Sequence, residues 1–166
     1  MRGRWIISEC DLEKDLKEIL EIEKCFGKSG WTHQMFVRSH GKSDHTCLFV
    51  AKGRERNRVE GYCAALIVME DLEIHRIAVR QAGRRQGVGS ALILDTLRRG
   101  AVKGAKNAFL DVRNSNVDAH RFYEGLGFRI ASRRQNYYSN PREDALVLSR
   151  SIKVLKADNG CDTVKL

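Results

Sequence analysis

A glycine-containing loop joins an apolar strand to a helix in the middle of the chain. The strand-like segment Ile74 to Val79 leads into Arg84-Arg85-Gln86-Gly87-Val88-Gly89, after which the apolar spacing becomes helical. A helix N-terminus presents unpaired N–H groups and a partial positive charge of about half a unit. Glycines allow the backbone to approach an anion closely, and arginines add charge-assisted hydrogen bonds. The loop therefore predicts a site for a phosphate or a pyrophosphate.

The spacing of this loop excludes two common nucleotide-binding motifs. The dinucleotide fingerprint G-x-G-x-x-G needs a third glycine where this chain has Leu92. A Walker loop needs Gly-Lys-Ser/Thr, which does not follow here. A glycine turn that merely begins a helix is the alternative interpretation, and the flanking arginines and the preceding strand argue against it.

The basic surplus of the chain is concentrated around this loop. The 166 residues carry a net charge of +9, and seven bases but one acid fall between Arg80 and Lys106. Modules that bind nucleic acid interleave aromatic and basic residues across a sheet face, as in RNA-binding folds. Here the bases gather at one loop–helix junction instead. The charge indicates a phosphate-rich small ligand, and nucleic acid is the less favoured partner.

Composition and cysteine usage exclude several classes of protein. With 42% hydrophobic and 31% charged residues, the chain is neither disordered nor collagen-like. Five cysteines without CxxC spacing are typical of reduced thiols in a cytoplasmic protein, and neither they nor the scattered histidines predict a metal site. No apolar run approaches the ~18 residues of a spanning helix, and no signal-peptide core follows the N-terminus. We expect a cytoplasmic protein without a membrane partner.

Hydrophobic periodicity predicts a single α/β domain over residues 1–153, followed by a tail over 154–166. Strands are expected over 5–7, 46–52, 59–69, 72–79, 107–113, 128–134 and 144–150. Helices are expected over 11–24, 31–38, 87–103 and 116–126. Antiparallel strands come first and strand–helix–strand–helix–strand follows, which predicts helices packed on one mixed sheet.

The segment Arg-x-x-Gly-x-Gly at 84–89 resembles the acetyl-CoA pyrophosphate motif of the GNAT superfamily of acyl-CoA N-acyltransferases. The segments IAVRQAGRRQGVGSALI (77–93), LDVRNSN (110–116), RFYEGLGF (121–128) and NYY…REDALVL (136–148) resemble the branch that acetylates the N-terminal alanine of a small-subunit ribosomal protein. The likeness covers roughly residues 5–150. It implies the GNAT fold, a mixed, mostly antiparallel sheet with a central parallel pair flanked by helices, and acetyl-CoA as co-substrate without a metal.

The resemblance also implies which residues hold the co-substrate. The backbone of the 84–89 loop would bind the pyrophosphate, and the main chain at 77–79 would pair with the pantetheine arm. Asn116 would hydrogen-bond that arm, although its position also suits a helix N-cap. The implied cofactor-binding residues are Ile77, Ala78, Val79, Arg84, Arg85, Gln86, Gly87, Val88, Gly89 and Asn116.

Asp111 falls where the resembled enzymes carry their general base, which is usually a glutamate. Aspartate is one methylene shorter, so its reach falls by about 1.5 Å, roughly one C–C bond. A base, acting directly or through water, would help to make the acceptor amine neutral. Glu73 and His75 share a strand face by period-2 alternation, and Glu73 could assist or replace Asp111. The alternatives are a polar strand end at Asp111 and a solvated strand face at the other two.

Tyr123 matches the tyrosine that, in the family, donates a proton to the departing CoA thiolate. Its alternative role is aromatic packing beside Phe122 and Phe128. Trp31 and the pair Tyr137-Tyr138 fall where a peptide end enters in that family, and core packing is an equal alternative for them.

Three functions remain open from the sequence. The expected one is transfer of an acetyl group to the N-terminal α-amine of a protein, with a small-subunit ribosomal protein as acceptor. The second is acetylation of a small amine such as a polyamine or an aminoglycoside. The third is a basic nucleic-acid-binding module or an inactive acyl-CoA sensor.

Overall fold

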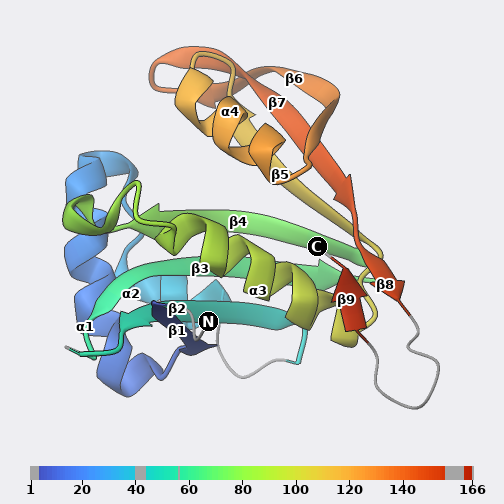
Figure 1. The fold of residues 1–166 in the computed structure, drawn as a ribbon. Helices are drawn as coiled ribbons and strands as arrows, with labels where there is room; N and C mark the ends of the chain where they lie inside the picture. Colours follow the sequence, from blue (N-terminus) through green and yellow to red (C-terminus); the bar gives the residue numbers. More distant parts are fainter. Residues whose placement is uncertain (1–3, 40–43, 56, 156–162, 166) are drawn as a thin grey trace.

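The computed structural model describes residues 4–39, 44–55, 57–155 and 163–165, and Figure 1 shows a sheet flanked by helices. The main sheet contains β1 (Trp5–Glu9), β2 (Thr46–Gly53), β3 (Val59–Val68), β4 (Asp71–Val79), β5 (Asn107–Arg113), β6 (Arg129–Ser139) and β7 (Arg142–Ser151). The helices are α1 (Leu12–Glu23), α2 (His33–Ser39), α3 (Val88–Val102) and α4 (Val117–Gly125), with short 3-10 turns η1 (Lys24–Ser29) and η2 (Gln81–Gly83). A separate antiparallel pair is formed by β8 (Lys153–Leu155) and β9 (Thr163–Lys165).

The strands of the main sheet follow the order β1-β2-β3-β4-β5-β7-β6. Neighbouring strands are antiparallel except β4 and β5, which run parallel at the centre. This arrangement confirms the predicted mixed, mostly antiparallel sheet with a central parallel pair.

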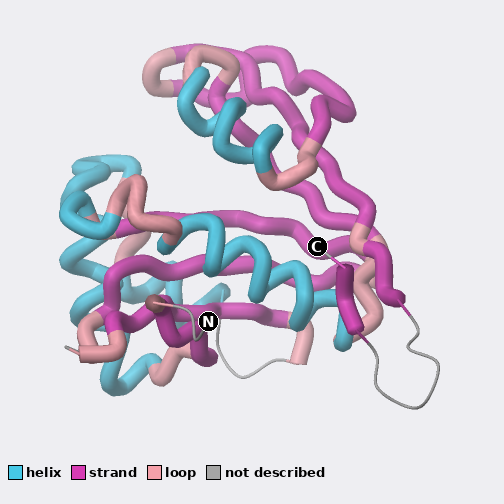
Figure 2. Tube along the Cα trace, viewed as in Figure 1, coloured by secondary structure: helices cyan, strands magenta, loops and turns pink. Residues whose placement is uncertain are grey.

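Helices cover both faces of this sheet, as Figure 2 shows. On one face, Leu92 and Leu97 of α3 pack in a core cluster that includes Cys63 of β3. On the other face, Ile19 of α1 packs in a cluster that includes Tyr62. Because successive residues of a strand point to opposite faces, the two neighbouring positions of β3 belong to different clusters. The alternation of the sequence thus sets the three-layer arrangement.

The parallel pair at the centre of the sheet is short. Its register runs only from Asp71 opposite Asn107 to Ile74 opposite Leu110, although β4 continues to Val79. The ladder between β3 and β4 is irregular at this point, because Ala65 pairs with Ile74 and Ala64 pairs with Arg76, which leaves His75 as an extra residue. A bulge of this kind bends the strand that carries it. Beyond it β4 and β5 diverge, as Figure 1 shows.

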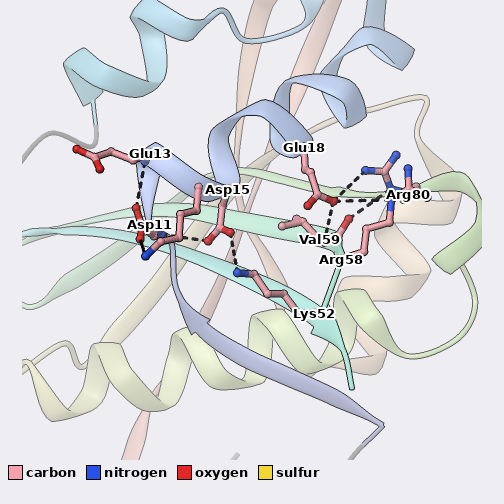
Figure 3. A network of polar contacts seen from close by, with 9 residues as sticks. Asp11, Glu13, Asp15, Glu18, Lys52, Arg58, Val59 and Arg80 are labelled. Atoms are coloured by element: carbon pink, nitrogen blue, oxygen red, sulfur yellow. Dashed lines mark hydrogen bonds and ion pairs between the residues drawn. The ribbon is translucent and has the colours of Figure 1, made fainter. Parts of the chain in front are cut away.

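The acidic run of α1 ties the helix to the sheet (Figure 3). Asp11 caps the helix by accepting a hydrogen bond from the Glu13 N–H. Asp15 is buried and its Oδ1 lies 2.6 Å from Lys52 Nζ of β2. The Glu18 carboxylate accepts a hydrogen bond from the Val59 N–H at 3.1 Å. Asp15 and Glu18 therefore anchor α1 on β2 and β3, whereas Asp11 acts within the helix.

Most of the bases between Arg80 and Lys106 also have protein partners, which corrects their assignment to a phosphate ligand. Arg80 lies 3.8 Å from Glu18 and donates to Glu21 at 3.4 Å. The other partnered bases are Arg98 and Arg99 with Asp95, Lys103 with the Asp44 carbonyl, and Lys106 with Glu70. Of the seven, Arg84 and Arg85 stay exposed beside the glycine loop. The concentration of charge in the sequence thus overstates the charge available to a ligand.

The last hairpin is longer than the sequence predicts. Residues 135–143, expected as a polar loop, lie mostly in β6 and β7, which extend to Ser139 and begin at Arg142. The register shifts between Arg134 and Tyr138, and Asn136 takes a positive φ of 52°. Asp144 of β7 supports this bulge by accepting a hydrogen bond from the Asn136 N–H at 2.7 Å. The predicted tail is described only at 154–155 and 163–165, and the rest of it lies outside the described residues.

Candidate active site

A cleft of about 930 Å³ lies where β4 and β5 diverge. It is lined by residues of η1, β4, β5, α4 and the last hairpin. The sequence-predicted residues that it brings together are Glu73, His75, Ile77, Asp111, Asn116, Tyr123, Tyr137 and Tyr138. Ala78, Val79 and the 84–89 loop lie further along β4 and at the start of α3, outside the lining of this cleft.

Asp111 has an unusual carboxylate. Its side chain is 26% exposed, yet its Oδ1 atom is buried and accepts no hydrogen bond from any described residue. The nearest cation is Arg134, whose Nε lies 3.5 Å from Oδ1, too far and too poorly aligned for a hydrogen bond. A buried oxygen without a donor is costly and is often explained by a functional role. This atom is therefore suited to receive a donor from a bound molecule.

Glu73 lies on the same side of the sheet as Asp111. Glu73 pairs with Phe109, and Asp111 follows Phe109 by two positions, so both carboxylates face the cleft. The Glu73 side chain lies beside His75, whose Nε2 is 3.3 Å from Glu73 Oε2. Both of these side chains are more than one-third exposed. Glu73 and His75 thus form a solvated pair beside Asp111 in the same cleft.

Tyr123 is held rigidly at the edge of the cleft. It is 7% exposed, and its ring packs edge-on against Phe122 and Phe128, with centroids 5.0 and 5.6 Å away. Asn116 starts the helix that carries it by accepting a hydrogen bond from the Ala119 N–H. Burial raises the pKa of Tyr123 far above its ordinary value, so the hydroxyl stays protonated. Tyr123 therefore combines the two roles: its ring packs on its aromatic neighbours, and its hydroxyl is a hydrogen-bond donor at the cleft.

Two arginine–tyrosine pairs form one wall of the cleft. The Arg113 guanidinium lies 4.1 Å from the centre of the Tyr138 ring, and that of Arg134 lies 5.4 Å from Tyr137. The two tyrosine rings meet edge to face at 5.2 Å. Burial, followed by the Asp111 charge, raises the pKa of Tyr138. Which arginine meets which tyrosine is not evident from the sequence, because the register shifts between Arg134 and Tyr138.

The opposite wall is anchored by a buried carboxylate. Glu23, at the end of α1, is 3% exposed and accepts hydrogen bonds from the Tyr62 hydroxyl, the Trp31 N–H and two nitrogens of Arg76. Arg76 in turn lines the cleft, and its guanidinium lies 4.4 Å from the centre of the Phe26 ring. This network holds η1 against β4. The signal in the sequence is that Glu23 falls on the apolar stripe of α1.

Of the three residues predicted to contact the acceptor peptide, Trp31 is the one that does not line the cleft. Its ring is partly buried against the core cluster beneath α1, 5.2 Å from that of Phe36. Its backbone N–H is one of the donors to Glu23. Trp31 therefore lies outside the cleft, beside the buried carboxylate that holds η1 against β4.

The glycine loop presents the N-terminus of α3 without a side-chain cap. Gly87 is the N-cap residue with a φ of 82°, a left-handed conformation that glycine adopts readily, and no side chain caps the helix. The first N–H groups of a helix have no partner inside it, so they suit an anion. A Cβ at Gly89 would lie 3.3 Å from the Phe122 ring, so glycine lets α3 and α4 approach each other. The N–H groups at the start of α3 fit the diphosphate of an acyl-CoA. The part of β4 that has no pair on the β5 side fits its pantetheine arm.

Within the described ranges, no group of three or more His, Cys, Asp or Glu side chains could hold a metal ion. No helix in the described part of the chain is long and apolar enough to cross a membrane. The four described cysteines, Cys10, Cys25, Cys47 and Cys63, are free thiols, and Cys161 lies outside the described residues.

Comparison with known proteins identifies the family and the fold. A protein of Bacillus subtilis (strain 168) is 30% identical over 148 residues, which span 89% of this chain and 96% of the relative. The [ribosomal protein bS18]-alanine N-acetyltransferase of Escherichia coli (strain K12) is 28% identical over 142 residues, 84% and 93% of the two chains. The crystal structure of the Escherichia coli ribosomal-protein-S18-alanine N-acetyltransferase superposes with a TM-score of 0.79 at 26% identity, covering 95% of this chain and 99% of that chain. The profile of the acetyltransferase (GNAT) family matches residues 16–128. The chain therefore belongs to the GNAT family of N-acetyltransferases.

Proposed function

We propose that this enzyme transfers the acetyl group of acetyl-CoA to the N-terminal α-amine of a protein, and that a small-subunit ribosomal protein is its acceptor. The observation that carries the proposal is the juxtaposition, in one cleft, of a carboxylate oxygen without a donor and a protonated tyrosine. The relatives named for alanine acetylation of ribosomal protein bS18 support the choice of acceptor. Such an acceptor also implies a cytoplasmic location.

The residues around the glycine loop and β4 would hold acetyl-CoA, whose thioester supplies an activated acetyl group. The uncapped N–H groups of α3 and the exposed Arg84 and Arg85 suit the diphosphate. The main chain at 77–79 extends beyond the last pair with β5 and offers backbone hydrogen bonds to the pantetheine arm. Asn116, which caps α4 at the edge of the cleft, would contact the same arm.

The acid and base follow from the positions of Asp111 and Tyr123. Asp111 Oδ1 accepts the proton that the amine gives up, directly or through a water molecule, as the new C–N bond forms. The Tyr123 hydroxyl donates to the sulfur as the C–S bond breaks, and its high pKa keeps the proton in place until the thiolate develops. Glu73 and His75, exposed beside Asp111, are the alternative route for the proton.

The wall of paired tyrosines favours a peptide over a small amine. Two aromatic rings braced by arginines offer a flat, amphipathic surface longer than a single amine requires. A panel of Ala-initiated peptides, polyamines and aminoglycosides, each with acetyl-CoA, separates the two classes. Turnover of peptides, and a mass gain of one acetyl group on a ribosomal protein, would support the proposal. Turnover of small amines alone would reject the peptide acceptor.

Asp111→Asn is expected to lower kcat by about two orders of magnitude, the usual size of a general-base contribution. The side chain keeps its shape but can no longer accept the proton of the amine. The pH dependence of kcat should change with it, because the residue that collects the proton is gone. Glu73→Gln tests the alternative route for the proton, and we expect it to retain most activity. A larger loss in Glu73→Gln than in Asp111→Asn would transfer the role to Glu73.

A further inference from the structure

Strand β1 contacts the glycine loop at 84–89 through Trp5. Trp5 lies on β1, and its indole Nε1–H donates a hydrogen bond to the Gln86 carbonyl oxygen at 3.1 Å, across 81 positions of sequence. The Trp5 ring is partly buried against the core cluster that contains Val88 and Leu92 of α3. The indole is therefore fixed by packing while its N–H reaches the residue that precedes Gly87.

This hydrogen bond sets the orientation of a particular peptide plane. In a planar trans peptide the carbonyl of one residue and the N–H of the next point in opposite directions. Because the Gln86 carbonyl points to Trp5, the Gly87 N–H points away from it. That N–H belongs to the N-cap residue of α3, next to the uncapped helix terminus. The indole thus binds the carbonyl end of the Gln86–Gly87 peptide and leaves the Gly87 N–H pointing away from β1.

The loop needs such a restraint because two of its residues have left-handed backbone conformations, one of which costs free energy. Arg85 has a φ of 57° and Gly87 a φ of 82°, so left-handed residues flank Gln86 on both sides. A left-handed residue other than glycine costs of order 1 kcal/mol and persists only where the surroundings enforce it. The Gln86 side chain donates to the Ala82 carbonyl at 2.7 Å, and Arg84 Nε donates to the Val79 carbonyl at 3.4 Å. These two bonds span four and five positions, whereas the bond from Trp5 ties the loop to β1 across 81 positions.

We propose that Trp5 is a positioning residue for the diphosphate, acting through the Gln86–Gly87 peptide rather than by touching the ligand. The inference rests on the proposed binding of acetyl-CoA. It predicts an effect confined to ligands that carry a diphosphate, because the main chain at 77–79 and the catalytic cleft do not depend on this hydrogen bond.

Trp5→Phe tests the proposal because phenylalanine keeps an aromatic ring but has no N–H to donate. We expect the Kd for CoA, measured by calorimetry, to rise about fivefold to tenfold. We expect kcat/KM with S-acetylpantetheine, which lacks the diphosphate, to stay within about twofold of wild type. Trp31→Phe makes the same chemical change in the other core cluster, and its Kd for CoA should match that of wild type.

A second measurement avoids any change at position 5. With 5-fluorotryptophan incorporated into Trp31→Phe, a single fluorine signal reports on Trp5, and it should shift when CoA binds but not when pantetheine binds. Three results would overturn the role of Trp5. The first is an equal Kd for CoA in wild type and Trp5→Phe, and the second is an equal loss of kcat/KM with acetyl-CoA and with S-acetylpantetheine. The third is a fluorine signal that does not shift when CoA binds. Absence of CoA binding by the wild type would instead reject the proposed function itself.

Discussion

Replacement of Tyr123 by phenylalanine is expected to lower kcat by about two to three orders of magnitude and to leave the Kd for acetyl-CoA within about twofold. A general acid contributes about 10²- to 10⁴-fold to rate, and the hydroxyl is the part of this residue that can donate a proton or a hydrogen bond to sulfur. Phenylalanine retains the edge-on packing against Phe122 and Phe128, so the helix that carries it stays in place.

The raised pKa of Tyr123 gives this prediction a pH test. Burial raises the pKa, so the hydroxyl remains the protonated donor well above the ordinary tyrosine pKa of about 10. Up to pH 10, kcat of the wild type should therefore show no alkaline decline caused by this group. Steady-state rates from pH 6 to 10, with thermal unfolding of both proteins as the control for folding, check both statements. A Tyr123→Phe enzyme with kcat within threefold of wild type would leave the tyrosine a packing role alone.

Replacement of Glu23 by glutamine is expected to lower the free energy of unfolding by about 3–5 kcal/mol, the range for breaking a buried ion pair. The two carboxylate oxygens accept four hydrogen bonds, from Tyr62 and Arg76 Nε on Oε1 and from Arg76 Nη2 and the Trp31 N–H on Oε2. Glutamine has one oxygen, so its NH₂ group faces donors in either orientation. On the Oε1 side the Tyr62 hydroxyl can turn to accept, but the Arg76 Nε–H cannot.

Chemical denaturation with urea measures this loss. Tyr62→Phe removes one donor and keeps the charge pair, so we expect a smaller loss, about 1–2 kcal/mol. Glu23→Gln should also raise the KM for the acceptor more than that for acetyl-CoA, because the network supports the wall formed by η1. A loss below about 1 kcal/mol would mean that the Arg76 charge finds solvent once its partner is removed.

The fold around the cleft follows from local sequence signals, whereas the candidate catalytic residues come from the resemblance. The period-2 stretch ending at Val79, the glycines at 87 and 89, and the helical spacing after them predict strand, turn and helix at their observed places. Asp111 and Tyr123 are identified by resemblance at fixed distances from that loop, and both line the cleft. The strand, the turn and the helix could be predicted because each depends on a few neighbouring residues.

The supports of the cleft could not be predicted in this way. Glu23 meets Arg76 across 53 positions, and Trp5 meets Gln86 across 81, so no periodicity relates them. The bulge in β6 depends on Asp144 in the opposite strand, and a polar segment of that kind is typical of a loop. The resemblance implies that Trp31 contacts the acceptor, with core packing as an equal alternative, and only the contact with Phe36 shows where its ring packs. Tertiary contacts decide each of these cases.

The short parallel pair between β4 and β5 has a consequence for solubility. Beyond Ile74 and Leu110 the two strands leave unpaired backbone edges within the interior of a sheet. Open strand edges are templates for pairing with other chains and promote aggregation unless they are covered. A proline on this stretch of β4 would remove an N–H group that is proposed to pair with the pantetheine arm. If the pantetheine arm binds there as proposed, we expect the protein without acyl-CoA to aggregate more readily than the complex, because the arm would cover this edge.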